Sequence, residues 1–389
     1  MKILVTGAKG FVGKNLCAQL NNIRTGKAVC HGDLVVTEVM EYDRDSSQED
    51  LDRYCRDCDF VFHLAGVNRP TAESEYMEGN AGFLSVLLDT LRKYGNRCPV
   101  MMSSSVQATL EGRYEGSSYG RSKRAAEQLM AEYGHLTGAK VLVYRFPNVF
   151  GKWCRPNYNS AVATFCSNIA NDLPIQVNDR DVELELLYID DLVEEMIWAL
   201  KGEEHHCREY PFCRCTVTHK ATLGEITDML YGFAEYPETL IMPKMPPGSL
   251  AMKLYSTYLS YLPASKASFF LNKNADARGS FTEMIRIRGY GQLSINVSRP
   301  GATKGQHWHN SKWEIFVVVS GHGLIRLRKI DTEEILTFEV DGRNPQPVFM
   351  LPGYTHSLVN LSEKEDMVTI IYSNEIFDPD RPDTYSLSV

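Results

Sequence analysis

The chain has 389 residues, which is enough for two or three domains that each bury a core of their own. Its composition, 43% hydrophobic and 23% charged, is typical of globular domains. The net charge of −8 argues against nucleic acid as a bulk partner, and no basic run predicts attachment to a membrane surface.

The N-terminus leads from Met1 and Lys2 directly into a short apolar segment and a glycine-rich loop. We therefore expect no secretory leader, and no long apolar segment predicts a membrane span. The 10 cysteines follow no disulfide-scaffold pattern. Reduced thiols and a cytoplasmic location are the expectation.

Residues 1–245 are predicted to alternate between strands and helices. Apolar, β-branched segments predict strands at 2–6, 34–39, 60–64, 100–102 and 141–146. Apolar spacing predicts helices that run from the glycine loop to residue 20, over 83–94 and over 119–133. The alternation predicts an α/β domain with a doubly wound, Rossmann-like parallel sheet and right-handed crossovers.

The pattern breaks after residue 242, where three prolines and Gly248 predict a linker over 246–264. A connecting helix is expected inside it, at 250–262. From residue 265 the sequence changes to short alternating strands, expected at 291–297, 315–319, 324–328 and 334–340. This pattern predicts a second domain over 265–389 that is all-β, a barrel or jelly roll.

A glycine loop connects the first predicted strand to the first predicted helix. Glycine recurs at every third position, at Gly7, Gly10 and Gly13, with Phe11 and Val12 between them. Residues without a Cβ allow backbone amides to approach a pyrophosphate at the helix N-terminus. The loop therefore predicts a dinucleotide site.

Tyr119 and Lys123 are four residues apart in a predicted helix, so they share one face. A phenol with a pKa near ~10 is a poor acid or base at neutral pH, and a neighbouring ammonium favours its phenolate. Ser105 ends the preceding run of serines, where its hydroxyl can hydrogen-bond a substrate carbonyl. The three residues together predict a catalytic group.

These motifs, together with His63-Leu64-Ala65-Gly66 and the pattern Arg145-x2-Asn148-x2-Gly151, resemble the extended short-chain dehydrogenase/reductases. The resemblance implies that Ser105, Tyr119 and Lys123 reduce or oxidise a nucleotide-sugar carbon with a nicotinamide cofactor. It implies substrate contacts from Asn148 and Asn157. It also implies cofactor contacts from Gly7, Gly10, Phe11, Val12, Gly13, Leu64, Ala65, Gly66, Tyr119 and Lys123.

The sequence departs from this family at one substrate position. Many members carry an arginine seven residues before the aspartate that matches Asp191, where it contacts the phosphates of the sugar nucleotide. Leu184 occupies this position here, and Arg180 is our candidate for the missing phosphate contact.

The choice of nicotinamide cofactor depends on the end of the second predicted strand. Arg44 lies near this end and would pair with a 2′-phosphate, which predicts NADPH. The adjacent Asp43 would instead favour NAD by binding the ribose hydroxyl, so NAD stays open as the alternative.

Four candidate metal ligands lie in the second predicted domain: His307, His309, Glu314 and His356. In a strand, His307 and His309 would point to the same face, and Glu314 follows a short polar turn. Three imidazoles and one carboxylate predict a divalent transition metal, zinc or one of its neighbours, rather than calcium or magnesium.

The spacing of these ligands resembles the two motifs of the cupin family. The first motif is matched without a gap by Gly301, His307, His309, Glu314 and Gly321, and the end of the second by His356 and Asn360. Residues 276–283 resemble the opening of nucleotide-sugar epimerase cupins, which move a proton beside a ketone. This sequence departs from those epimerases because it carries a full metal set.

Over both domains, the chain resembles a family of bifunctional capsular-polysaccharide enzymes. The distinctive shared stretches are 152–160, 177–180, 254–263 and 377–379. The resemblance implies that the cupin domain epimerises C3 of a UDP-2-acetamido-2,6-dideoxy-4-hexulose and that the reductase domain then reduces the C4 ketone with NADPH. The implied product is UDP-N-acetyl-6-deoxy-L-talosamine, a precursor of N-acetyl-L-fucosamine, and a homodimer is expected.

Two alternatives stay open. In the first, the cupin is a binding or dimerising module with a structural metal, which a closed four-ligand zinc site would favour. In the second, the chain is an oxygen-using metalloenzyme, although nothing else in the sequence predicts redox chemistry at the metal. The sequence does not identify the residue that would act as the base at C3.

Overall fold

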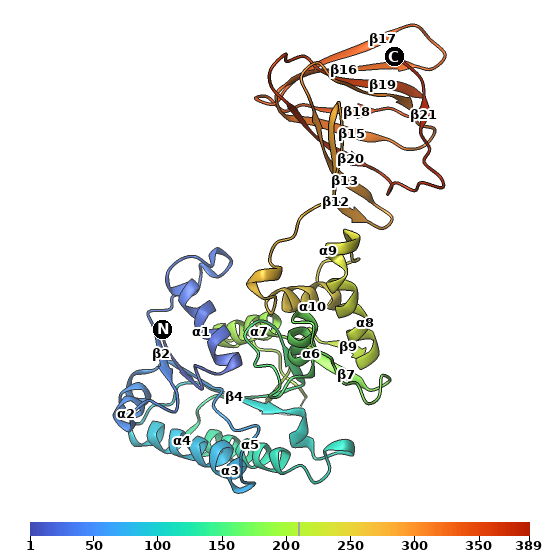
Figure 1. The fold of residues 1–389 in the computed structure, drawn as a ribbon. Helices are drawn as coiled ribbons and strands as arrows, with labels where there is room; N and C mark the ends of the chain where they lie inside the picture. Colours follow the sequence, from blue (N-terminus) through green and yellow to red (C-terminus); the bar gives the residue numbers. More distant parts are fainter. Residues whose placement is uncertain (209–210) are drawn as a thin grey trace. The chain divides into compact units, whose positions relative to one another are not determined.

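The computed structural model describes residues 1–208 and 211–389, which form two compact units (Figure 1). Unit 1 consists of Met1–Leu230 and Gly248–Leu262, and unit 2 of Tyr231–Pro247 and Pro263–Val389. This division differs from the expected boundaries, because helix α10 (Leu250–Leu259) packs into unit 1 and strand β10 (Ile241–Met242) pairs within unit 2. The proline-rich segment therefore lies between two structured elements.

The sheet of unit 1 is parallel, with strand order β2-β1-β3-β4-β5-β8. Its strands are β1 (Lys2–Thr6), β2 (Glu38–Tyr42), β3 (Phe60–His63), β4 (Val100–Ser105), β5 (Val141–Phe146) and β8 (Phe212–Cys213). The order reverses at β1, which has β2 on one side and β3 on the other. Ligands of open α/β sheets bind outside the carboxyl ends of the strands at such a reversal. The structure confirms the doubly wound sheet. A ligand is therefore expected to bind at the loops after β1 and β3.

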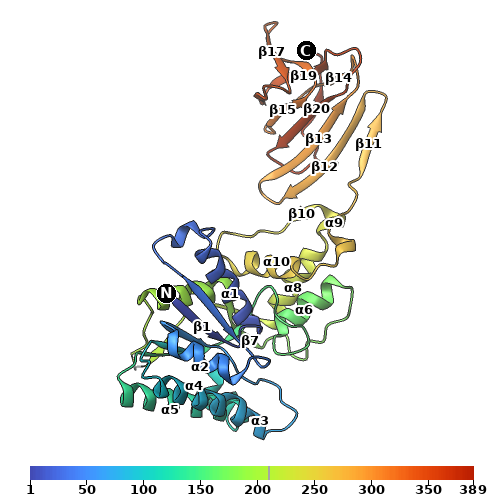
Figure 2. The ribbon, with the colours of Figure 1, turned by 90° about the vertical axis from the view of Figure 1, so that its left-hand side faces the viewer.

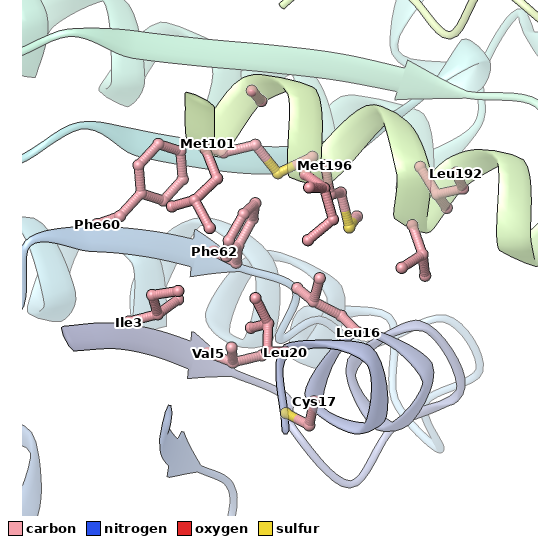
Figure 3. Close-up of a cluster of buried hydrophobic side chains, with 14 of the residues drawn as sticks. Ile3, Val5, Leu16, Cys17, Leu20, Phe60, Phe62, Met101, Leu192 and Met196 are labelled. Carbon is pink, nitrogen blue, oxygen red and sulfur yellow. The ribbon is translucent and has the colours of Figure 1, made fainter. Parts of the chain in front are cut away.

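Helices cover both faces of this sheet. They are α1 (Phe11–Arg24), α2 (Gln48–Asp57), α4 (Phe83–Lys93), α5 (Ser118–Thr137) and α7 (Ile189–Lys201). Side chains alternate along each strand, so Ile3 and Phe62 pack against α1 and α7 (Figure 3), whereas Leu4 and Val61 pack against α2, α4 and α5. Each such side chain contributes roughly 1.5–3 kcal/mol when it is fully buried, so the two cores hold the strand ends in place.

Unit 1 also contains a small second sheet, with order β6-β7-β9. Its strands are β6 (Asn148–Phe150), β7 (Glu183–Tyr188) and β9 (His219–Thr222), and the helices nearby in the chain are α6 (Ala161–Ala170) and α8 (Leu223–Ala234). Helix α10 lies against α6, and the Tyr261 hydroxyl donates to the carbonyl of Cys154. These contacts explain why α10 belongs to unit 1.

Unit 2 consists mainly of two β-sheets (Figure 2) and also contains the short helix α9 (Tyr236–Thr239). One sheet has the order β10-β12-β13-β20-β15-β18, with β11 paired to β12, and the other has the order β17-β16-β19-β14-β21. The strands of the first sheet are β11 (Lys273–Asp276), β12 (Gly279–Ile287), β13 (Gly291–Ser298), β15 (Glu314–Ser320), β18 (Pro347–Met350) and β20 (Met367–Ser373). Those of the second are β14 (Thr303–Trp308), β16 (His322–Lys329), β17 (Ile335–Asp341), β19 (Tyr354–Asn360) and β21 (Tyr385–Ser386). Phe316 of the first sheet and Leu358 of the second share one core, which confirms the predicted all-β domain.

The second strand of unit 1 lies later than predicted, at β2 (Glu38–Tyr42) instead of 34–39. It is one of the two edge strands of the sheet, and its positions 38 and 41 are exposed glutamates. The prediction relied on a continuous apolar segment, which is typical of a strand buried on both faces. An edge strand that carries charged side chains lacks this pattern. Val36, inside the expected segment, is buried in the core that also contains Ile3 and Phe62, without belonging to a strand.

Among the described residues, no helix combines the length and the apolar character needed to span a membrane.

Candidate functional sites

The glycine loop after β1 forms a tight turn. Gly7 has a positive φ of 70°, and its amide donates to the carbonyl of Tyr42 at 2.8 Å. A Cβ on Gly13 would lie 2.1 Å from the carbonyl oxygen of Gly7, so no side chain fits there. Helix α1 begins at Phe11 with Gly10 as its N-cap, and no side chain caps its first amides. The helix N-terminus is therefore free to bind an anion such as a pyrophosphate.

The loop after β3 lies directly against this turn. A Cβ on Gly7 would lie 2.7 Å from the amide nitrogen of Ala65, and the Leu64 amide donates to the carbonyl of Thr6 at 3.1 Å. The predicted cofactor residues of the two loops thus meet where the strand order reverses. Such a junction suits a dinucleotide.

Asp43 and Arg44 follow immediately after β2. The Asp43 carboxylate accepts hydrogen bonds from the amides of Lys9 and Arg44, each at 2.8 Å. Arg44 is exposed, and its guanidinium makes no hydrogen bond or ion pair with another described residue. Asp43 therefore joins the end of β2 to the glycine loop, while Arg44 is available to an incoming phosphate.

The structure brings Ser105, Tyr119 and Lys123 together. Ser105 ends β4, and the other two lie in the first turns of α5. The Lys123 Nζ donates to the carbonyl of Ser103 at 3.0 Å and lies 5.9 Å from the centre of the Tyr119 ring. This is an arrangement in which a hydroxyl, a phenol and an ammonium can act on one carbonyl.

Burial dominates the ionisation of both helical residues. It raises the pKa of the Tyr119 phenol, and a hydrogen bond with Ser105 offsets part of this effect. It lowers the pKa of Lys123 to about 8, while Glu127 acts in the opposite direction. Desolvation therefore dominates the phenol pKa, and the opposing contribution comes from Ser105 instead of Lys123. A phenol that stays protonated is suited to donate a proton to a carbonyl oxygen.

Glu127 lies one turn after Lys123 and is 5% exposed. Its carboxylate accepts from the Ser104 hydroxyl at 2.5 Å and from Nε of Arg145 at 2.8 Å. Arg145, the first residue of the predicted Arg-x2-Asn-x2-Gly pattern, thus connects β5 to α5. Charge-assisted contacts of this kind hold α5 in register with the sheet.

Asn80 is a candidate positioning residue that sequence reasoning missed. It lies in a π-helical segment, Glu78–Gly82, and is 1% exposed. Its side chain accepts from the Val67 amide at 3.0 Å and donates to the Ser122 hydroxyl at 2.9 Å. Asn80 therefore ties the loop after β3 to the turn that carries Lys123. π-Helical turns occur frequently at functional sites, but this one has no recognised sequence signal.

A cavity of about 330 Å³ opens beside Tyr119, lined also by Asn68, Tyr76, Gln107, Ser117, Ser118 and Asn159. The Tyr76 and Tyr119 ring centres are 5.8 Å apart. A cavity with two phenols and several amides and hydroxyls can hold a sugar.

The three predicted substrate residues do not line this cavity. The Asn148 side chain donates to the carbonyl of Glu185 at 3.1 Å, and the backbone amide of Asn157 donates to the Thr164 hydroxyl at 3.0 Å. The Arg180 guanidinium binds both carboxylate oxygens of Asp228, at 2.7 and 2.8 Å. Arg180 is thus already paired, and a phosphate would have to compete with Asp228.

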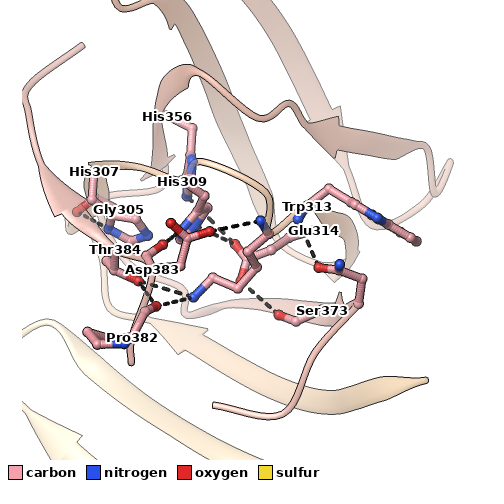
Figure 4. Close-up of polar contacts among 12 residues, drawn as sticks. Gly305, His307, His309, Trp313, Glu314, His356, Ser373, Pro382, Asp383 and Thr384 are labelled. Atoms are coloured by element: carbon pink, nitrogen blue, oxygen red, sulfur yellow. Dashed lines mark hydrogen bonds and ion pairs between the residues drawn. The ribbon is translucent and has the colours of Figure 1, made fainter. Parts of the chain in front are cut away.

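Unit 2 brings the four candidate metal ligands to one point (Figure 4). One ligand atom of each of His307, His309, Glu314 and His356 lies within 4.8 Å of the others. His307 lies in β14 and His356 opposite it in β19, with ring centres 4.5 Å apart. His309 lies just beyond the end of β14, which contains a bulge at Gln306, so its placement differs from a continuous strand.

The polar environment of this cluster fits a cation. Nε2 of His309 and both ring nitrogens of His356 are buried and have no hydrogen-bond partner among the described residues. Burial disfavours the Glu314 carboxylate, but the His309 and His356 rings and the Ser373 hydroxyl outweigh it and hold its pKa at about 2. Burial lowers the pKa of His356 to about 3, so the ring is neutral and can donate a lone pair. Neutral imidazoles and an ionised carboxylate are the forms that bind transition metals.

A cavity of about 440 Å³ leads to the cluster. His307, Glu314 and His356 line it together with Phe281, Asn296 and Lys304. His309 is 2% exposed and does not line it. The predicted motif residue Asn360 is not a ligand, because its amide donates to the carbonyls of Ser298 and Glu365, both at 2.9 Å.

Comparisons with known proteins match both units. The model of the NAD dependent epimerase/dehydratase family matches residues 3–210, and that of the polysaccharide biosynthesis C-terminal domain matches residues 274–385. A relative from Pseudomonas aeruginosa named UDP-2-acetamido-2,6-beta-L-arabino-hexul-4-ose reductase is 40% identical over 389 residues, 100% of this chain and 99% of the relative.

Solved structures show the same relationship. The capsular polysaccharide assembling protein CapF from Staphylococcus aureus is 45% identical, with a TM-score of 0.89 over 100% of both chains. The UDP-glucose 4-epimerase of Thermus thermophilus, solved as a complex with NAD, is 19% identical over 69% of this chain and 100% of its own, with a TM-score of 0.53. The second match shows a shared fold.

Proposed function

Because the chain belongs to the NAD dependent epimerase/dehydratase family, and resembles the reductase from Pseudomonas aeruginosa over its whole length, we propose that it reduces the C4 ketone of a UDP-linked 2-acetamido-2,6-dideoxy-4-hexulose. The observation that carries this proposal is the meeting of Ser105, Tyr119 and Lys123 beside the cavity at the end of the parallel sheet. The product would be UDP-N-acetyl-6-deoxy-L-talosamine, a precursor of N-acetyl-L-fucosamine in surface polysaccharide.

Each residue of the group has one role in this reaction. The Ser105 hydroxyl donates a hydrogen bond to the ketone oxygen and orients it. Tyr119 donates its proton to that oxygen as C4 becomes tetrahedral, and the Lys123 ammonium stabilises the phenolate that remains. A nicotinamide cofactor, when bound, supplies the hydride that C4 accepts.

The residues around the two loops fit such a cofactor. The positions of Gly7 and Gly13 have no room for a Cβ, and the first amides of α1 have no side-chain cap. The Arg44 guanidinium would bind a 2′-phosphate, so we propose NADPH as the reductant. The Asp43 carboxylate, which would otherwise bind a ribose hydroxyl, already accepts two backbone amides.

We further propose that unit 2 is a cupin-type domain that binds one divalent transition metal, zinc, through His307, His309, Glu314 and His356. The support is the convergence of the four ligand atoms and the unpartnered buried nitrogens of His309 and His356. When bound, the metal would act as a Lewis acid on a carbonyl in the adjoining cavity. The proposed reaction there is epimerisation at C3, because the C4 ketone acidifies the C3 proton.

The order of the two reactions follows from their chemistry. Reduction at C4 removes the ketone that makes the C3 proton acidic, so epimerisation has to come first. One keto-sugar would therefore visit unit 2 before unit 1. The family resemblance also leads us to propose a homodimer, which light scattering of the purified protein would test.

The full-length Tyr119→Phe variant separates the two activities. With the keto-sugar in deuterated water and without NADPH, it should place deuterium at C3, as read by NMR. With NADPH, it should lose reduction by roughly 100- to 10,000-fold, because the general acid is missing. The matched control is Tyr133→Phe, on the same helix, whose hydroxyl donates to the carbonyl of Asn96 at 3.3 Å away from the cavity.

Two results would change the assignment. Near-normal NADPH consumption by folded Tyr119→Phe would remove Tyr119 from the reaction. Absence of C3 exchange in the wild-type protein would leave unit 2 as a metal-stabilised binding or dimerisation module, the alternative that a closed four-ligand site favours.

A further inference from the structure

The C-terminal tail, residues 382–389, lies beside the candidate metal site. Within it, β21 pairs with β14 on the side opposite β19, so that His307 is opposite Ser386 and Trp308 is opposite Tyr385. The Leu387 amide donates to the carbonyl of Gln306 at 3.0 Å, and the Thr355 hydroxyl bonds the carbonyl of Leu387. The tail therefore touches both strands that carry histidines of the cluster.

Asp383 makes the contacts nearest the candidate ligands (Figure 4). Its carboxylate accepts hydrogen bonds from three successive amides, those of Asn310, Ser311 and Lys312, at 3.0, 2.9 and 3.0 Å. Successive backbone N–H groups that point to one anion form a concave binding site. In this protein the anion is a side chain from a segment more than 70 residues later in the chain.

The backbone of Asp383 also fixes the state of His309. Its carbonyl oxygen lies 2.6 Å from Nδ1 of His309, so Nδ1 carries the hydrogen and donates it. The other nitrogen, Nε2, is then a lone-pair donor, and it lies 3.7 Å from the Glu314 carboxylate inside the cluster. A hydrogen bond to the far nitrogen of a histidine sets the tautomer and ring orientation that a metal requires.

The turn that Asp383 holds is the connection between two candidate ligands. Residues 310–312 lie in the short segment that joins His309 to the strand that begins at Glu314. The Lys312 ammonium, whose residue is 6% exposed, donates to the Pro382 carbonyl at 3.0 Å and to the Thr384 hydroxyl at 3.1 Å. Asp383 itself has a positive φ of 38°, a conformation that costs free energy and persists where surrounding contacts impose it.

We infer that the C-terminal tail is part of the metal site, with Asp383 as a positioning residue that orients His309 and fixes the spacing between His309 and Glu314. Metal binding and tail docking are then coupled, and each strengthens the other by the same factor. This inference rests on the proposed metal binding by unit 2.

Zinc affinity of the full-length protein tests the inference. Purified apo protein is titrated with zinc against a fluorescent chelator, for the wild type, Asp383→Asn, deletion of residues 382–389, and the control Asp380→Asn. Asp380 is an exposed carboxylate just before the tail, outside the contacts of the 310–312 turn. Loss of an outer-shell partner typically weakens metal binding by roughly 10- to 100-fold. We expect the Kd for zinc to rise about tenfold in Asp383→Asn and up to about 100-fold in the deletion variant.

Hydrogen exchange of the tail amides, measured on the same folded proteins, tests the coupling without using activity. Zinc should slow exchange at residues 383–389 in the wild type and in Asp380→Asn, and should slow it less in Asp383→Asn. Equal zinc affinities for Asp383→Asn and Asp380→Asn, or tail exchange that zinc does not change, would overturn the inference. A wild-type protein that binds no zinc at all would overturn the proposed metal site together with it.

Discussion

Gly66 and Lys123 share one small space: a Cβ on Gly66 would lie 3.1 Å from the Lys123 Nζ and 2.7 Å from the Asn80 Oδ1. The loop that is proposed to hold the cofactor and the helix that carries Tyr119, the proposed proton donor, are therefore adjacent at this point. Because Gly66 has no side chain, the Lys123 ammonium has room between the loop and the helix. This contact links the candidate cofactor loop to the helix of the proposed proton donor.

Gly66→Ala should impair reduction more than it impairs folding. The added methyl group would displace the Asn80 amide or the Lys123 ammonium, and overpacking of this kind costs about 1–3 kcal/mol. We expect kcat/KM for keto-sugar reduction to fall at least about tenfold, since about 1.4 kcal/mol corresponds to a factor of ten. Gly232→Ala is the control, because nothing lies within 4 Å of a Cβ there. Equal kinetics in the two variants would show that the space beside Lys123 is not critical.

The pH dependence of reduction should report the Lys123 ammonium. Its pKa is lowered to about 8 by burial, so the charge that stabilises the phenolate is present below this pH and is lost above it. Plots of kcat/KM against pH should therefore decline above about pH 8 in the wild type. Glu127 raises the pKa of Lys123, so Glu127→Gln should move this decline to lower pH.

The matched control for the pH experiment is Glu132→Gln, at an exposed position on the same helix. It should leave the decline where the wild type has it. Circular dichroism has to show that Glu127→Gln is folded, because Arg145 loses its buried partner in this variant. A decline that moves equally in both variants, or in neither, would argue against Lys123 as the titrating group.

Arg44→Ser should change the preference between the two nicotinamide cofactors. If the guanidinium binds the 2′-phosphate, its removal forfeits a hydrogen bond to a charged group worth roughly 1.5–3 kcal/mol. KM for NADPH should then rise about 10- to 100-fold while KM for NADH changes little. The control is Arg53→Ser, which removes an exposed guanidinium paired with Asp50. A parallel rise for both cofactors would assign Arg44 to general binding rather than to the 2′-phosphate.

His307→Ala should lower the zinc content of the purified protein. The residue contributes one of four converging ligand atoms, and three ligands hold the ion less tightly than four. Zinc per chain is measured by mass spectrometry after dialysis against a weak chelator. His322→Ala is the matched control, since His322 is in the same unit but pairs with Glu339 at 2.7 Å. Unchanged zinc content in the His307 variant would exclude this residue from the site.

Much of the candidate site in unit 1 could be predicted because its parts are local. The glycine spacing, the serine run and the tyrosine–lysine pair each lie within a few residues, and a parallel sheet brings the carboxyl ends of its strands to one edge. Strand β5 begins and ends where the apolar run predicted it. The contribution of Asn80 could not be predicted, because it depends on contacts between a π-helical turn, the loop after β3 and α5.

In the candidate metal site, even more depends on contacts between residues that lie far apart in the sequence. Its four residues were found from their types and spacing, although the bulge at Gln306 places His309 beyond the strand that was expected to carry it. No sequence motif around Asp383 predicts that it contacts the candidate metal ligands. Its contacts with His309 and with the turn at 310–312 join residues more than 70 positions apart in the sequence. They form only because the tail pairs with β14 in the folded domain.

The path of the chain has a consequence for how the two units can be divided. It passes from one unit to the other after Leu230, after Pro247 and after Leu262. A fragment that ends at residue 245 lacks α10, and with it the buried Leu254 and Thr257, whereas a fragment that starts at 265 lacks the strand paired to Arg286 and Ile287. A single cut at either place would therefore remove from one unit an element that it packs or pairs with.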